Sequence, residues 1–167
     1  LTVKVNPAAL SSSPKDIVTF FPNVNTIVVD TLSSLREIDT LPDTVTSIVL
    51  KSYDHDCSCE SHPKFIDRIV EIRDCSVCMT YDFSHFSTLQ YIRFASAPNT
   101  VHLPNHTLKS ITVFWTSWMD NPLTVFPLDC AEQIVFIFTN WFLFSKTKEK
   151  QLPPHVRLFC SGLCPGA

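Results

Sequence analysis

Short apolar pairs recur along this chain at a nearly constant interval, and this recurrence limits the possible folds more than any other feature. The first residues of seven successive pairs are separated by 21, 22, 22, 19, 23 and 22 positions. Alternate residues of a strand point to one face, so each pair marks an apolar edge that a single unit cannot bury. The interval therefore predicts stacked units with a continuous core. The pairs are Ile27/Val29, Ile48/Leu50, Val70/Ile72, Ile92/Phe94, Ile111/Val113, Ile134/Phe136 and Val156/Leu158.

A further pair, Val3/Val5, precedes the first of these by 24 residues and predicts an eighth strand at the edge of the stack. Strands of a β-sandwich recur roughly every 8–12 residues, which does not fit this interval. A chain of 167 residues is long enough for one sizeable core. We therefore expect a single repeat domain with an N-terminal cap or edge strand over residues 1–21, repeats over 22–159 and a C-terminal cap over 160–167.

Four of the units follow the pattern L-x-x-L-x-L, and on these residues the chain resembles the leucine-rich repeat family. The four are Val24-x-x-Ile27-x-Val29, Val45-x-x-Ile48-x-Leu50, Leu89-x-x-Ile92-x-Phe94 and Leu108-x-x-Ile111-x-Val113. The resemblance implies an α/β solenoid, predominantly β, with about seven parallel strands on a concave face. A right-handed parallel β-helix stacks its strands at about the same period and stays the alternative.

The chain departs from the family pattern at the turns that leave the strands. The family places Asn or Cys three residues after the last strand leucine, and here only Cys75 conforms among Leu32, Tyr53, Cys75, Ala97, Thr116, Thr139 and Ser161. The third unit also has Asp67 where the first leucine belongs, and the sixth has Ala131. We expect an irregular array whose turns are held by other means.

Composition and charge remove several classes of function. The chain has two glycines, both in its last six residues, so no glycine-rich phosphate-binding loop is possible. The net charge is -3, and no basic run or basic face favours nucleic acid. The longest apolar run, from Ile134 to Phe144, is shorter than the roughly 20 residues that span a bilayer. The chain begins at Leu1 without a signal-peptide pattern, as in a mature or excised fragment.

The residues that flank each inward pair are expected to line the exposed face of the strands, which the resemblance implies is the binding face. Tyr, Trp and Arg often carry interface energy, so we expect a protein or peptide ligand. Two other interpretations stay open: the charged residues could form a cross-strand ion-pair ladder, and the apolar C-terminal strands could be covered on both faces. The candidate ligand-binding residues are Glu71, Arg73, Tyr91, Arg93, Phe114 and Ile137.

Four of the seven cysteines form two close pairs, Cys57/Cys59 and Cys75/Cys78, on turns of neighbouring units. Neighbouring strands lie about 4.8 Å apart, so we expect the pairs to meet and favour disulfides over free thiols and structural zinc. Cys160 and Cys164 resemble a cysteine-bearing C-terminal cap. Asn105 opens a glycosylation sequon in a predicted turn. Together these features favour an extracellular or cell-surface protein, with no cofactor or metal in the preferred interpretation.

Three functions follow from these expectations. The preferred one is a non-catalytic recognition module, such as a receptor ectodomain or a secreted recognition protein. The alternative is an intracellular scaffold or substrate-recognition module with reduced thiols and a structural zinc. The weakest is a polysaccharide-acting enzyme on a β-helix, because the aligned carboxylates Asp30 and Glu71 lie two units apart rather than one. Asp82 and His85 can be drawn as an acid–base pair, but residues this close in sequence on a loop are a weak signal.

Overall fold

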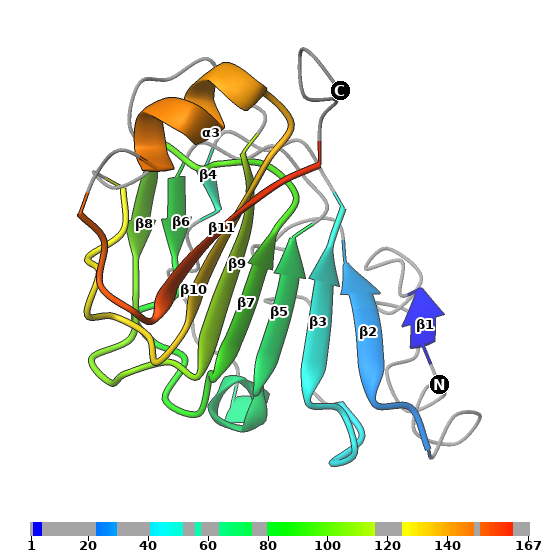
Figure 1. Cartoon of the computed structure of the whole chain (residues 1–167). Coiled ribbons are helices and arrows are strands. Elements are labelled where there is room, and N and C mark those ends of the chain that lie inside the picture. The colour runs from blue at the N-terminus through cyan, green and yellow to red at the C-terminus, as the bar shows by residue number, and fades with distance from the viewer. Residues whose placement is uncertain are drawn as a thin grey trace.

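The protein is a β-solenoid built mainly from one large parallel sheet (Figure 1). The computed structural model describes residues 2–4, 23–29, 41–51, 56–57, 64–74, 80–115, 125–148 and 151–161. Within these ranges the large sheet has eight strands, and each strand pairs in parallel with the next. This confirms the predicted stack of parallel strands. The strands are, in spatial order, β1 (Thr2–Lys4), β2 (Thr26–Val29), β3 (Ser47–Leu50), β5 (Glu71–Asp74), β7 (Tyr91–Phe94), β9 (Ser110–Trp115), β10 (Ile134–Phe138) and β11 (Val156–Cys160).

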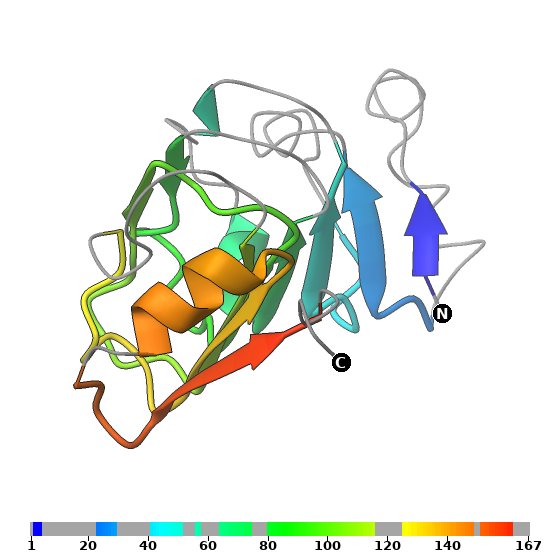
Figure 2. The same cartoon turned by 45° about the horizontal axis from the view of Figure 1, so that its top comes forward.

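A second, smaller layer lies behind part of the large sheet (Figures 1 and 2). In the part of the chain that the structure describes, it consists of three short parallel strands, β4 (Asp56–Cys57), β6 (Thr80–Asp82) and β8 (Thr100–His102). The chain alternates between the two layers from β3 to β9. Among the described residues there are two helical segments: η2 (Lys64–Arg68) leads into β5, and α3 (Trp141–Lys148) connects β10 to β11. Between β3 and β9 each repeat unit crosses from the large sheet to the second layer and back. This is why the strands of the large sheet recur about every 22 residues, rather than about every ten as in a β-sandwich.

The pairing register confirms most of the predicted alignment. Ile27 lies opposite Ile48, Ile92 opposite Ile111, and Ile134 opposite both Ile111 and Val156. The edge strand is also confirmed, because β1 pairs with β2 and places Val3 opposite Ile27. Val5, the second member of that predicted pair, lies outside the described residues.

The third unit is the place where the predicted register is wrong. The sequence alignment puts Val70 opposite Ile48, but the structure puts Ile72 there, two residues further along. The cause is η2, which takes up the preceding residues and leaves Ile69 fully buried and Val70 half-buried. Ile69-x-x-Ile72 then occupies the first two apolar positions of the repeat pattern, so Asp67 is not a defect in it. A shift of two residues leaves every side chain on its original face, and Glu71 and Arg73 stay on the predicted face.

The core fills the space between the large sheet and the returning segments. Alternate residues of β9 and β10 are buried, as the burial patterns iBiBiB and BiBiB show. Aromatic rings form a connected series through this core, and neighbouring ring centroids lie 5.3–6.4 Å apart. The series joins both layers and ends at α3. Its members are Tyr81, Phe83, Phe86, Phe94, Phe126, Trp115, Phe136, Phe138 and Phe144.

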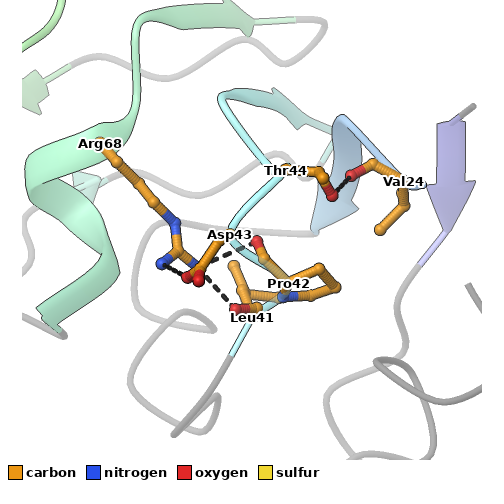
Figure 3. A network of polar contacts seen from close by, with 6 residues as sticks. All are labelled: Val24, Leu41, Pro42, Asp43, Thr44 and Arg68. Carbon is orange, nitrogen blue, oxygen red and sulfur yellow. Dashed lines mark hydrogen bonds and ion pairs between the residues drawn. The ribbon is translucent and has the colours of Figure 1, made fainter. Parts of the chain in front are cut away.

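Polar side chains just before five strands of the large sheet, β3, β5, β7, β9 and β11, bond to the main chain of the preceding unit, and we call this set the entry ladder. Figure 3 shows its first two members. The Thr44 hydroxyl donates to the carbonyl of Val24. The Arg68 guanidinium donates to the carbonyls of Leu41 (2.6 Å) and Pro42 (3.0 Å) and forms an ion pair with Asp43 (2.7 Å). Arg68 therefore satisfies two main-chain acceptors that do not belong to its own unit.

The entry ladder continues along the stack. The Thr88 hydroxyl donates to the carbonyls of Asp67 (2.6 Å) and Ile69 (3.1 Å), and His106 Nε2 donates to the carbonyl of Leu89 (2.6 Å). Near the C-terminal end, His155 Nε2 donates to the carbonyl of Leu128. These contacts lie before the strands, whereas the family's asparagines lie after them. The entry ladder therefore holds the turns that enter the strands. At two of the turns that leave them, the hydroxyls of Thr139 and Ser161 donate to the carbonyls of Trp115 (3.4 Å) and Phe138 (3.2 Å) in the preceding unit.

Candidate binding face

The candidate site lies on the outer face of the large sheet, which we define as the face turned away from the core. All six predicted residues occupy the strand positions that alternate with buried ones. They differ in how far they reach solvent: Arg73, Tyr91 and Arg93 are exposed, whereas the others are half-buried. The sheet therefore holds all six on one surface. The other three are Glu71, Phe114 and Ile137.

Glu71 and Arg73 form an ion pair along one strand rather than between strands. Arg73 Nε lies 2.8 Å from Glu71 Oε1, and a second guanidinium nitrogen lies 3.0 Å from Oε2. The hydroxyl of Ser47 on the neighbouring strand also donates to Oε2 (3.2 Å). A partly exposed ion pair contributes about 0–1 kcal/mol to stability. The pair fixes both side chains and leaves Arg93, on the next strand, outside the cross-strand ladder that was the alternative interpretation.

Arg93 stacks on an aromatic ring instead. Its guanidinium carbon lies 5.0 Å from the centroid of Phe114 on the adjacent strand β9. This distance is within the range of a cation–π contact, which leaves the N–H groups at the guanidinium edge available to a ligand. Tyr91 precedes Arg93 by two residues on the same strand, and 44% of its surface is exposed. The two side chains present a planar cation and an aromatic ring side by side.

Three apolar side chains lie next to this pair, and we call them the apolar strip: Phe114, Ile137 and Phe159. They occupy one register row, because Phe114 lies opposite Ile137 and Ile137 lies opposite Phe159. Phe159 is 52% exposed, and the other two are half-buried. The C-terminal strands are thus not buried equally on both faces. Phe159 and Arg157, which alternation along β11 also places on this face, belong to the site although our candidate residues did not include them.

The candidate acid–base pair gains no support from its electrostatics. The Asp82 carboxylate accepts hydrogen bonds from the hydroxyl (2.6 Å) and the amide (2.9 Å) of Ser84. Burial raises the pKa of Asp82, but these bonds and the nearby His85 and His102 outweigh it, and the pKa falls below its ordinary value. Asp82 therefore stays a carboxylate that holds a turn. No group of three His, Cys, Asp or Glu side chains in the described ranges is arranged to hold a metal ion.

The predicted disulfide cysteines lie mostly outside the described residues. Cys59, Cys75, Cys78 and Cys164 lie outside the described residues, so both predicted staples and the C-terminal cap stay predictions. The backbone of Cys57 lies in β4 opposite Tyr81 of β6. Cys130 forms no disulfide.

Cys130 is half-buried in the turn that leads into β10, and its thiol is chemically quiet. Burial, together with the neighbouring Asp129 carboxylate, raises its pKa to about 11. At pH 8 the thiolate fraction of Cys130 is therefore about a hundredfold below that of an ordinary cysteine. A more basic thiolate is also more nucleophilic, which offsets about tenfold of this loss in the alkylation rate. We expect iodoacetamide to alkylate Cys130 about tenfold more slowly in the folded chain than in the chain unfolded by denaturant. Peptide mass spectrometry of samples taken over time measures both rates. A native rate that levels off below pH 9 would contradict the raised pKa.

Asn105 is exposed in the turn before β9, so its amide is accessible for glycosylation. The modification itself stays a prediction.

Within the described part of the chain, no helix combines the length and the apolarity that a membrane crossing requires. No protein-family model, no curated protein and no solved structure matches the chain.

Proposed function

We propose that this chain is a non-catalytic recognition module of the leucine-rich repeat type that binds a protein or peptide on the outer face of its large sheet. The observation that carries the proposal is the Arg93–Phe114 stack, which stands between exposed Tyr91 and the apolar strip. Aromatic and arginine side chains dominate the binding energy of protein interfaces. The accessible sequon at Asn105 supports an extracellular setting.

The same residues contribute little to the fold. Tyr91 and Arg93 are exposed, and the Glu71–Arg73 ion pair is partly solvated. Substituting exposed residues usually changes the free energy of unfolding by less than about 0.5 kcal/mol. Neighbouring strands nevertheless hold these side chains in a fixed register, which reduces the entropy lost when a ligand binds. Rigid presentation without a large role in stability is what a recognition face requires.

A random-peptide display library panned against the whole chain tests the proposal. We expect peptides to be enriched, and the triple variant Arg73→Thr, Tyr91→Thr, Arg93→Thr to bind them at least about tenfold more weakly. Threonine suits strands, so we expect the free energy of unfolding to change by less than about 1 kcal/mol. Polarisation titrations and urea unfolding measure the two effects.

A matched control exists on α3, where Lys146 Nζ lies 4.6 Å from the ring centroid of exposed Phe142. This is also a cation–π pair, but it is on a helix rather than on the outer face. Phe142→Ala, Lys146→Ala should leave peptide binding unchanged. If this control variant lost binding as strongly as the triple variant, or if no peptide preferred the unaltered chain, the outer face would not be the recognition site.

A further inference from the structure

The outer face from β5 to β11 has the opposite charge to the chain as a whole. These strands carry three arginines on that face, Arg73, Arg93 and Arg157, but only one carboxylate, Glu71. The chain has a net charge of -3. Glu71 is already paired with Arg73, and in the described part of the chain no carboxylate pairs with Arg93 or Arg157. Two arginines are thus left to attract negative charge from outside.

Arg93 and Arg157 lie in one register row that crosses the strands. Arg93 is opposite Thr112, Thr112 is opposite Val135, and Val135 is opposite Arg157. Three strand spacings separate the two arginines, which is about 14 Å. An extended peptide rises about 3.3 Å per residue, so residues i and i+4 lie about 13 Å apart and point to the same side. A peptide laid across the strands can therefore place one carboxylate on each arginine.

The apolar strip lies beside this row. Phe114, Ile137 and Phe159 each follow the row by two residues along their strands, a distance of about 6.6 Å. Residue i+2 of the crossing peptide points at the face between Thr112 and Val135. A large apolar side chain at that position can lean onto the strip and bury surface there. The face thus offers two cationic positions with an apolar position between them.

From this arrangement we infer that the ligand is an extended acidic segment of a protein, with carboxylates at i and i+4 and a large apolar side chain at i+2. The inference rests on the function proposed above and specifies its ligand. The carboxylates bind Arg93 and Arg157, and the apolar side chain packs on the apolar strip. The Phe114 ring holds the Arg93 guanidinium in place, and a fixed planar guanidinium suits bidentate binding of a carboxylate.

An acidic peptide fits this face better than other polyanions do. A sulfated polysaccharide would satisfy the arginines, but it has no large apolar side chain to cover Phe159, which is 52% exposed. Binding to an anionic membrane surface requires clustered basic residues, each of which contributes about 1 kcal/mol to the binding free energy. Here the two available arginines are separated by Thr112 and Val135. The mixed character of the face therefore favours a polypeptide.

The test uses three labelled peptides and fluorescence polarisation on the whole chain. The probe is Ser-Asp-Ser-Phe-Ser-Asp-Ser. One comparison peptide has the same composition with adjacent aspartates, and the other has asparagine in place of both aspartates. We expect the probe to bind at least about tenfold more tightly than either, and Arg93→Gln or Arg157→Gln each to weaken it about tenfold. The control Lys146→Gln on α3 should have no effect.

A charge reversal tests the pairing itself. The variant Arg157→Glu should no longer bind the probe. It should instead bind a peptide in which lysine replaces the second aspartate, because the exchanged charges attract each other again. If the library panned above enriches peptides without this acidic pattern, the inference is wrong while the proposed function stands. Tighter binding of heparin or phosphatidylserine vesicles than of the probe also overturns it. If no library peptide binds the outer face, the proposed function itself fails.

Discussion

Replacing Phe94 with alanine is expected to lower the free energy of unfolding by about 3–5 kcal/mol, the usual cost of removing a buried aromatic ring. Phe94 is fully buried and points from β7 towards the second layer. Its ring centroid lies 5.3–6.2 Å from those of Tyr81, Phe83 and Phe126. The substitution would open a cavity where the two layers meet, and large rigid rings around that cavity limit how far the core can collapse to fill it.

Urea unfolding followed by circular dichroism measures this loss. The matched control is Phe142→Ala, which removes the same side chain from the exposed face of α3, where Phe142 is 60% exposed. We expect the control to change the free energy of unfolding by less than about 1 kcal/mol. Similar losses for both variants would show that the aromatic series does not hold the layers together.

Replacing Arg68 with alanine is expected to cost about 1–3 kcal/mol, because the carbonyls of Leu41 and Pro42 would lose a charged donor. The effect is large for a side chain that is partly exposed, since it breaks contacts between two units rather than within one. Urea unfolding gives the loss of stability. Hydrogen exchange of the Ile48 and Ile72 amides should speed up most, because β3 and β5 start at the affected turns.

The control for Arg68 is another ion pair between neighbouring units. Lys109 Nζ lies 2.6 Å from Glu132 Oε1, but both side chains are about half-exposed, and among the described residues the Lys109 side chain donates to no main-chain carbonyl. Lys109→Ala should therefore cost less than about 1 kcal/mol. If it cost as much as Arg68→Ala, the ion pair with Asp43 would explain the stability, and the carbonyl contacts would not.

The interval between apolar pairs predicted the large sheet because each unit contributes one strand in which buried apolar residues alternate with outward-facing ones. It could not predict the second layer. Asp56–Cys57, Thr80–Asp82 and Thr100–His102 are two or three residues long, too short for a period of two to be recognised. The register error at Val70 has a different cause: Ile69, Val70 and Ile72 offer two apolar spacings, and only the packing of η2 chooses between them.

The candidate face was predictable because alternation fixes which side chains point outward, even after a two-residue shift. Contacts between those side chains were not. Nothing in the spacing of Glu71, Arg73 and Arg93 indicates that the ion pair stays on one strand while Arg93 turns to Phe114. The entry ladder was missed because polar residues were sought after the strands. Thr44 and Thr88, each directly before the first apolar residue of a unit, carried the signal.

The entry ladder also explains how units of unequal length can share one sheet. Each ladder contact fixes where a strand begins relative to the strand before it, as Thr88 does for β7 against Ile69. A unit that is a few residues longer or shorter then differs only in the segment that returns to the sheet. The register of the next strand is set again by its own ladder contact. Spacing errors therefore do not accumulate along the stack. Such a chain can gain or lose residues in its return segments over evolution without disturbing the order of side chains on the face that it presents.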